Sequence, residues 1–245
     1  DANAQTISGA GASARWSSTN AAVAAVDSIT GRVTATGNGA AQVIARLDSA
    51  ADTTAVTVSQ RLVRFAFSPV NLVLSALNFD TVVTVTALDA GGTSLGTGSP
   101  AFTTSLTALS PGVASVTQLT NTTFRVTSQG NAANPVGVRV VDVVGGVADD
   151  TLLVSVGQVA QSMVITSSAS DTIDAFQDTV RVRARSFDGR NVEVQTRPIS
   201  WTSLNTSIAT VDQAGLTTGL PAGSVQIEAK MDAATARASL LVRTT

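Results

Sequence analysis

Three arginines at alternating positions are the densest group of side chains that could bind a ligand. Arg181, Arg183 and Arg185 are separated by small apolar residues, and this period places side chains on opposite faces of a strand. It predicts a single strand over 180–185 with all three guanidinium groups on one exposed face. An anionic polysaccharide or a lipid headgroup could bind that face. The alternative is a solvated sheet face, which the 8 basic and 8 acidic residues of 159–245 favour.

Carboxylates are the second group that could do chemistry. Asp149 and Asp150 are adjacent, and Asp171, Asp174 and Asp178 follow one another at short spacing. Loop carboxylates at a domain joint can hold Ca²⁺, although this spacing lacks the regular acidic pattern and the bidentate Glu of a helix–loop–helix calcium site. We therefore expect no cofactor, with Ca²⁺ at the domain joints as the alternative.

The composition excludes several function classes. The chain has no Cys and no His, so zinc sites built on them and His-dependent nucleophilic sites are impossible. No carboxylate pair has a catalytic spacing, and we expect no enzyme. The net charge of −2 does not favour nucleic-acid binding, which needs a basic surface. No apolar run is long enough for a membrane span, so we expect no membrane insertion in these residues.

Residue usage predicts an all-β fold. The 245 residues include 33 Val, 34 Thr and 8 Ile, but one Lys and two Glu. β-branched residues suit a pleated, half-buried surface, whereas long unbranched helix formers are nearly missing. Alanine is abundant, but it does not form the apolar stripe of a helix.

A repeat of about ninety residues organises these strands. Trp16, Leu106 and Trp201 lie 90 and then 95 positions apart, and each is followed by two β-branched residues at offsets of seven and ten. The three aligned sets are Trp16, Val23 and Val26; Leu106, Val113 and Val116; and Trp201, Ile208 and Val211. This period fits one small β-sandwich per repeat. We expect all nine residues to be core residues. The indoles could instead be sugar-stacking platforms, but Leu106 in the equivalent position favours a core role.

The pattern W-S-S-x-N-x-x-V-A-x-V-D, followed by G-x-V-T-A and G-x-A-x-V-I-A, resembles the bacterial immunoglobulin-like group 2 (BIG2) domain. The resemblance extends over residues 1–60 and 159–245, and residues 61–158 resemble a diverged member. It implies tandem immunoglobulin-like (Ig-like) β-sandwich domains of the kind found in bacterial surface adhesins, intimin-like proteins and phage virion proteins.

The first of the three predicted domains is shorter than the others. Residues 1–60 begin at the turn that Asp89 and Asp188 occupy in the later repeats, so the first two strands have no counterpart. Three explanations are open: the sequence is an excerpt of a longer array, another subunit completes the domain by strand addition, or the half-domain is disordered.

These patterns predict a mechanical role. We expect a non-catalytic stalk, spacer or fibre-forming segment of an extracellular or cell-surface bacterial protein. Its partners would be Ig-like domains of the same or identical chains, and surface glycans are a further candidate. The alternatives are an adhesin or carbohydrate-binding module, a decoration of a phage virion, and a subunit of a self-assembling extracellular filament completed by strand exchange.

Overall fold

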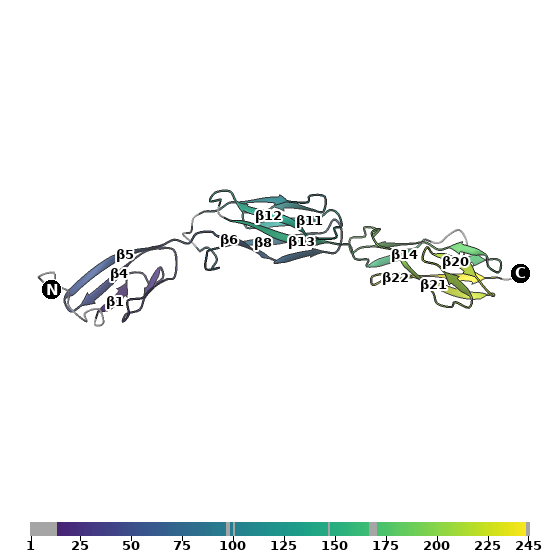
Figure 1. Cartoon of the computed structure of the whole chain (residues 1–245), viewed down its shortest axis with the longest axis horizontal. Coiled ribbons are helices and arrows are strands. Elements are labelled where there is room, and N and C mark those ends of the chain that lie inside the picture. Colours follow the sequence, from purple (N-terminus) through teal and green to yellow (C-terminus); the bar gives the residue numbers. More distant parts are fainter. Residues whose placement is uncertain (1–13, 97–98, 100, 147, 167–170, 244–245) are drawn as a thin grey trace. The chain divides into compact units, whose positions relative to one another are not determined.

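The computed structural model describes residues 14–243 apart from 97–98, 100, 147 and 167–170. Every regular element in this part of the chain is a β-strand (Figure 1), which confirms the all-β prediction. The predicted start of the first domain, at residues 1–5, lies outside the described residues. We call residues 14–60 the N-terminal segment, 61–158 the middle segment and 159–243 the C-terminal segment.

The N-terminal segment forms two small antiparallel sheets. One has the order β1-β4-β5 and the other pairs β2 with β3. Their bounds are β1 (Arg15–Ser18), β2 (Ala24–Val26), β3 (Val33–Ala35), β4 (Gly39–Leu47) and β5 (Ala50–Val58). The buried hydrophobic cluster of this segment is small: Val23, Ala24 and Ala41, with Val56 and Val58 partly buried against them.

The middle segment contains two four-stranded sheets, with the orders β10-β11-β8-β6 and β7-β13-β12-β9. The first sheet comprises β6 (Arg64–Ser68), β8 (Asp80–Leu88), β10 (Ala114–Gln118) and β11 (Thr123–Ser128). The second comprises β7 (Asn71–Leu74), β9 (Thr104–Ala108), β12 (Val136–Asp142) and β13 (Asp149–Val156). Two sheets of this size fit the predicted sandwich class.

The C-terminal segment has sheets of the orders β15-β22-β21-β18, β16-β20-β19 and β14-β17. The first sheet comprises β15 (Thr172–Ile173), β18 (Ser200–Ser203), β21 (Gly223–Met231) and β22 (Ala234–Val242). The second comprises β16 (Thr179–Arg181), β19 (Ala209–Val211) and β20 (Leu216–Gly219), and the third β14 (Ser162–Ile165) and β17 (Ala184–Phe187).

The chain divides into two compact units. Unit 1 comprises Asp1–Phe67, Val85–Ser105 and Val140–Asp150, and unit 2 comprises Ser68–Thr84, Leu106–Arg139 and Thr151–Thr245. The predicted boundaries after residues 60 and 158 therefore lie inside units. The division into domains 1–60, 61–158 and 159–245 stays a prediction.

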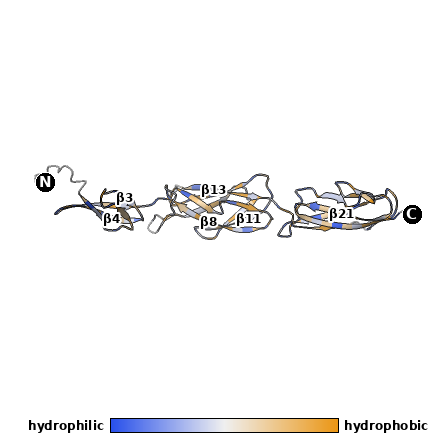
Figure 2. Cartoon of the chain, turned by 90° about the horizontal axis from the view of Figure 1, so that it is seen from below, coloured by the Kyte–Doolittle hydropathy of each residue, from blue (hydrophilic) through white to orange (hydrophobic). Residues whose placement is uncertain are grey.

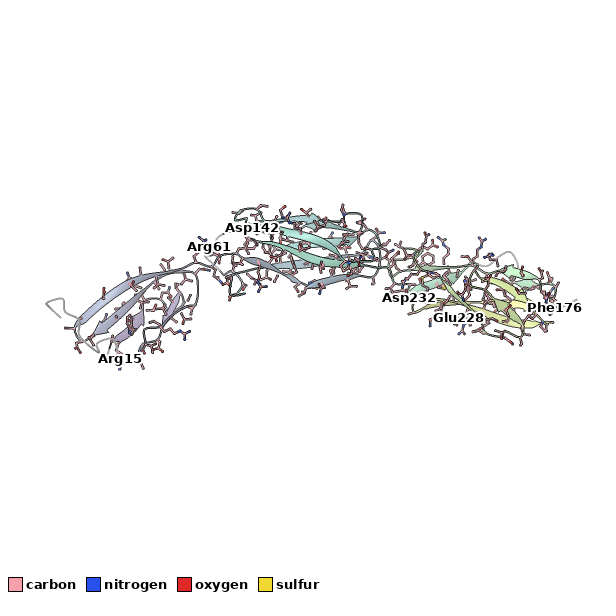
Figure 3. The ribbon with its side chains drawn as sticks, in the orientation of Figure 1. Arg15, Arg61, Asp142, Phe176, Glu228 and Asp232 are labelled. Carbon is pink, nitrogen blue, oxygen red and sulfur yellow. The ribbon has the colours of Figure 1, made fainter. Side chains whose placement is uncertain are left out.

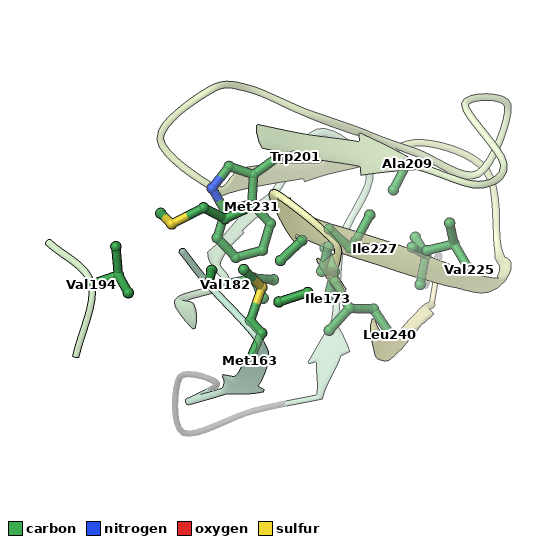
Figure 4. Close-up of a cluster of buried hydrophobic side chains, with 14 residues drawn as sticks. Met163, Ile173, Val182, Val194, Trp201, Ala209, Val225, Ile227, Met231 and Leu240 are labelled. Atoms are coloured by element: carbon green, nitrogen blue, oxygen red, sulfur yellow. The ribbon is translucent and has the colours of Figure 1, made fainter. Parts of the chain in front are cut away.

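Strand alternation explains the hydrophobic core of the C-terminal segment. Along β21, alternate residues from Val225 to Met231 are buried. Hydrophobic and hydrophilic residues likewise alternate along the strands in Figure 2. Figure 4 shows the resulting cluster, in which Trp201 and Met163 lie among side chains from several strands. Burial of this apolar area is the main stabilising contribution to such a sandwich.

Residues 180–185 do not form the single strand that their alternation predicts. The strand is interrupted between Arg181 and Ala184, and β16 pairs with β20 whereas β17 pairs with β14. Val182 is nevertheless buried, and its N–H donates to the carbonyl of Gly215 at 2.8 Å. The three arginines are exposed as predicted, but Val180 and Ala184 are only half-buried. The predicted continuity of the strand was wrong, because a period of two does not reveal which neighbouring strand pairs with each half.

Two glycines lie directly against the indoles. Gly31 and Gly215 have φ values of +73° and +76°, in the left-handed region that favours glycine. A Cβ on Gly31 would lie 2.6 Å from the Trp16 ring, and one on Gly215 would lie 2.3 Å from the carbonyl oxygen of Val182. The turn before each indole-contacting glycine is held by an aspartate, Asp27 or Asp212, whose Oδ1 accepts backbone N–H groups.

Candidate functional site

A buried amide–carboxylate cluster in unit 2 joins residues on both sides of the predicted boundary after residue 158. The Gln158 side chain donates from Nε2 to Asp188 Oδ2 at 2.8 Å and accepts at Oε1 from Asn131 Nδ2 at 2.7 Å. The Gln158 backbone N–H donates to Asn131 Oδ1 at 2.7 Å. Gln158 and Asp188 are 5% and 3% exposed. We call Asn131, Gln158 and Asp188 cluster II.

Asp188 connects cluster II to two backbone segments. Its Oδ2 accepts the N–H of Leu77 at 2.9 Å, and its Oδ1 accepts the N–H groups of Arg190 and Val192 at 2.9 and 3.0 Å. Burial opposes ionisation of this carboxyl, but the hydrogen bonds from Gln158 and from backbone N–H groups outweigh it and lower the pKa of Asp188. The carboxylate is therefore ionised at neutral pH and accepts hydrogen bonds at both oxygens.

The same three residue types recur in unit 1 at the predicted boundary after residue 60. Gln60 Nε2 donates to Asp89 Oδ2 at 2.9 Å, Asn38 Nδ2 donates to Gln60 Oε1 at 2.9 Å, and the Gln60 N–H donates to Asn38 Oδ1 at 2.6 Å. These are the same donor and acceptor atoms as in cluster II. We call Asn38, Gln60 and Asp89 cluster I.

Cluster I is more open to solvent than cluster II. All three of its residues are half-buried, and a hollow of about 590 Å³ lies beside them, lined also by Thr93, Ser94 and other residues. The hydrogen bond from Gln60 comes first among the causes that lower the pKa of Asp89, followed by the backbone N–H of Thr93. Each cluster thus holds one ionised carboxylate among amide donors, an arrangement suited to holding backbone segments together and not to proton transfer at neutral pH.

A second group of side-chain hydrogen bonds holds the backbone next to cluster II. Asp232, labelled in Figure 3, lies in the turn between β21 and β22. Its Oδ2 accepts the N–H of Ala160 at 2.7 Å. Arg197 donates to both oxygens of this carboxylate and, at 2.5 Å, to the carbonyl of Gln158. The backbone on both sides of Val159 is therefore fixed by side chains of the C-terminal segment.

The three predicted arginines do not lie on one continuous strand. Arg181 donates to the carbonyl of Ala214 at 3.0 Å, and Arg185 forms an ion pair with Glu193, with 2.9 Å between Nε and Oε1. Arg183 lies in the interruption between β16 and β17 and lines an open hollow of about 490 Å³. Use of these residues as an anionic-ligand patch stays a prediction.

The predicted core residues differ in burial among the three segments. Trp201 is 9% exposed and Val23 is buried. The other members are half-buried: Trp16, Val26, Leu106, Val113, Val116, Ile208 and Val211. Trp201 points into the cluster of Figure 4, between Met231 and Val182.

The candidate calcium ligands lie in separate surroundings. Asp150 Oδ2 accepts the N–H of Phe65 at 2.6 Å, and Asp178 Oδ1 accepts the N–H of Thr179 at 2.7 Å. Within the described ranges, no group of three or more acidic residues gathers in a way that could hold a metal ion. The absence of a cofactor stays a prediction, with calcium at the domain joints as its alternative.

Sequence reasoning identified Asp89 and Asp188 as turn residues but missed both clusters. The partners are 22 and 29 positions apart in cluster I and 27 and 30 apart in cluster II, so no local motif connects them. The repeat did contain a signal. Gln60 and Gln158 are each the last residue of a predicted domain, and Asn38 and Asn131 each follow a glycine.

Comparison with known families agrees with this architecture. Residues 162–242 match the family model of the bacterial Ig-like domain (group 2). This confirms the predicted resemblance for the C-terminal segment and its Ig-like β-sandwich fold. No curated protein matches the chain. The part of the chain that the structure describes contains no helix long and apolar enough to cross a membrane.

Several solved structures resemble the chain at low identity. Domains 4–9 of the surface layer protein SbsC match with a TM-score of 0.34 and 18% identity, over 98% of this chain and 40% of that one. Invasin, a bacterial integrin-binding protein, matches with a TM-score of 0.38 and 14% identity, over 95% and 52% of the two chains. An intimin fragment crystallised with the intimin-binding domain of its receptor matches with a TM-score of 0.37 and 14% identity, over 72% and 63%. The chain therefore spans less than two thirds of each of these three structures.

Proposed function

We propose that this chain is a non-catalytic structural segment, a stalk or spacer, of an extracellular or cell-surface bacterial protein. Its clusters I and II fix the connections between successive Ig-like sandwiches. The observation that carries the proposal is the recurrence of one hydrogen-bonded arrangement, with the same donor and acceptor atoms, at two places about a hundred residues apart. The match of residues 162–242 to a bacterial Ig-like family supports the bacterial and structural parts of the proposal.

The physical argument rests on what the clusters do to a short connection. Gln158 is held at its backbone N–H, its side-chain oxygen and its side-chain nitrogen, by Asn131 on one side and Asp188 on the other. Hydrogen bonds to an ionised carboxylate are stronger than neutral ones, and breaking one here would remove a hydrogen bond from a buried polar group that water does not readily reach. Each cluster therefore opposes hinge motion at its connection.

Distance measurements between spin labels test this proposal. The chain has no cysteine, so Thr117→Cys on β10 and Ser239→Cys on β22 give one defined pair of labels, both on exposed residues of unit 2. We expect a narrow distance distribution that Gln158→Ala broadens. The matched control is Gln226→Ala, at an exposed residue of β21.

Two results would overturn the proposal. One is a distribution in the unsubstituted labelled chain that is already as broad as in Gln158→Ala. The other is saturable glycan binding that is abolished by Arg183→Ala and unchanged by Gln158→Ala, which would instead favour a carbohydrate-binding module.

A further inference from the structure

Within unit 2, loop 76–80 of the middle segment contacts the turn that follows β17. Arg190 in this turn lies over the Phe79 ring, with 5.4 Å between Cζ and the ring centroid. Its Nη2 is 3.5 Å from Asp80 Oδ1, and Arg125 Nε is 3.2 Å from Oδ2 of the same carboxylate. One aspartate is therefore shared by two guanidinium groups, one from the middle and one from the C-terminal segment. We call these four side chains the arginine contact.

A buried serine holds this loop. The Oγ of Ser128, which is completely buried, donates to the carbonyl of Ala76 at 2.6 Å and accepts the N–H of Phe79 at 3.0 Å. The Ser128 carbonyl accepts the N–H of Asn78, which has a φ of +54°. These hydrogen bonds fix the loop on both sides of Leu77, whose N–H donates to cluster II. All of them form within the middle segment, so the loop is oriented without help from the C-terminal segment.

The C-terminal segment contains the same backbone arrangement without the serine. Gln177, with a φ of +62°, donates its N–H to the carbonyl of Gly219 as Asn78 does to Ser128. The Gly219 N–H donates to the carbonyl of Asp178, and the Ser128 N–H makes the equivalent bond. Glycine has no side chain, so this arrangement of the backbone does not require the serine hydroxyl. The hydroxyl of Ser128 instead adds hydrogen bonds to the loop that carries the arginine contact.

The turn of cluster I has no arginine at the equivalent position. In both turns the residue three positions after the aspartate has a positive φ, +81° at Gly92 and +60° at Asn191. The residue before it is Arg190 in the turn of cluster II but Gly91 in the turn of cluster I. Because glycine has no side chain, cluster I lacks a cation at this position. The two connections therefore differ in a contact that depends on charge.

Ionic strength acts differently on the arginine contact and on cluster II. The side chains of Asp80, Arg125 and Arg190 are between 40% and 48% exposed. Mobile ions screen attractions between exposed charges, whereas hydrogen bonds between buried groups are screened much less. A single exposed ion pair contributes little to stability, but here one carboxylate binds two guanidinium groups and one of these also covers a ring.

We propose that the arginine contact makes the connection at cluster II stiffer at low than at high ionic strength. Ser128 positions loop 76–80 to receive Arg190, and Arg190 joins the two segments through Phe79 and Asp80. At low ionic strength the arginine contact and cluster II act together, and at high ionic strength cluster II acts alone. This role rests on the proposed function, since the contact can only stiffen a connection that cluster II already holds.

Amide exchange of Leu77 in the full chain, followed by NMR at two salt concentrations, tests this proposal. Arg190→Gln removes the charge and keeps most of the side-chain length. At about 20 mM NaCl we expect Leu77 to exchange about threefold faster in this variant, relative to Val154 in β13. About 0.5 M NaCl should raise the rate of the unsubstituted chain to the same value and leave the variant unchanged. The matched control is Arg237→Gln, which removes an exposed ion pair with Glu228 elsewhere in the C-terminal segment.

A second variant tests the positioning role of the serine. Ser128→Ala removes the hydroxyl and keeps the backbone hydrogen bonds that Gly219 also makes. We expect faster exchange at Phe79 and Leu77, a smaller effect of salt on Leu77, and an unchanged rate at Val154. Faster exchange at Val154 as well would mean that Ser128 stabilises the whole segment and does not position the loop, which would overturn this part of the proposal.

The outcomes separate the arginine contact from the proposed function. Unchanged Leu77 exchange in Arg190→Gln, or a salt dependence that persists in this variant, would overturn the proposal. An equal effect of Arg237→Gln would also overturn it, because the cause would then be overall charge. If Gln158→Ala broadens the spin-label distances while Arg190→Gln has no effect, the proposed function stands without the arginine contact. If Gln158→Ala leaves those distances unchanged, the proposed function fails whatever Arg190→Gln does.

Discussion

The N-terminal and C-terminal segments carry the same repeat but bury it to different extents. Trp16 and Trp201 occupy equivalent positions in β1 and β18, which pair with β4 and β21 in the same register. Trp201 is nevertheless buried in a large cluster, whereas Trp16 is half-buried beside a small one. The repeat therefore determines the local pairing of strands, and the strands that precede it determine how much apolar area leaves water.

The largest expected difference between the segments concerns the indoles. Trp201→Ala removes a buried ring and should lower the free energy of unfolding of the C-terminal segment by about 3–5 kcal/mol. Trp16→Ala should cost less than half as much, because Trp16 is only half-buried and the hydrophobic cluster of its segment is small. Denaturant unfolding followed by circular dichroism measures both. Equal losses would contradict the difference in burial on which this comparison rests.

Substitution of the glycine beside the indole should also cost more stability in the C-terminal segment than in the N-terminal segment. Gly215→Ala places a Cβ against backbone at a positive φ, and we expect a loss of about 1–3 kcal/mol. At Gly31 the obstacle is the half-exposed Trp16 ring, which can move aside, so Gly31→Ala should be milder. Thermal unfolding of the two single variants checks the order. A larger effect at Gly31 would show that the Trp16 ring is held as firmly as the backbone at Val182.

Clusters I and II can be compared in the same way, because each lies at a predicted domain boundary and they differ in burial. Gln158→Ala removes the side-chain hydrogen bonds from Asn131 to Gln158 and from Gln158 to the buried carboxylate of Asp188, and should cost about 1–3 kcal/mol. Gln60→Ala should cost less, since water can replace Gln60 at the half-buried Asp89. Chemical denaturation of both variants measures this, with Gln226→Ala as the exposed control. Equal losses of stability in Gln60→Ala and Gln158→Ala would show that burial of the cluster does not change its contribution to stability.

Acid should also reduce the stability that cluster II contributes, by less than Gln158→Ala does. The folded-state pKa of Asp188 is lowered, because hydrogen bonds from Gln158 and backbone groups outweigh the opposing effect of burial. Its contribution to stability is therefore fully present above the unfolded-state pKa of about 4 and is lost as the pH falls through the lower folded-state value. Unfolding curves between neutral pH and pH 2, compared with Asp188→Asn, isolate this contribution. A variant with the same pH dependence as the unsubstituted chain would contradict it.

Much of the architecture could be predicted from local patterns. β-branched composition, period-two alternation and the repeated Trp and Leu positions were sufficient for the all-β fold, and residues 162–242 match the predicted family. These features are local or strictly periodic, so one sequence reveals them. The interruption between Arg181 and Ala184 was not predictable in this way, because alternation continues through it while the pairing partner changes.

Most of the candidate site could not be predicted, because its atoms come from distant positions. Asn131 and Asp188 meet at Gln158 through side-chain hydrogen bonds that no sequence spacing implies. The recurrence of Asn, Gln and Asp at corresponding places in two repeats was visible in principle. Polar residues in loops are common, however, and their presence alone does not distinguish a solvated turn from a buried cluster.

Amide exchange at Leu77, followed by NMR, tests the central claim most directly. The Leu77 N–H donates to Asp188 Oδ2, so it joins the middle segment to the carboxylate of cluster II at a single atom pair. We predict that this amide is protected in the unsubstituted chain and exchanges at least about tenfold faster in both Asp188→Ala and Gln158→Ala, while the amide of Val154 in β13 is unaffected. Exchange of Leu77 at the rate of an unstructured peptide in the unsubstituted chain would contradict the account.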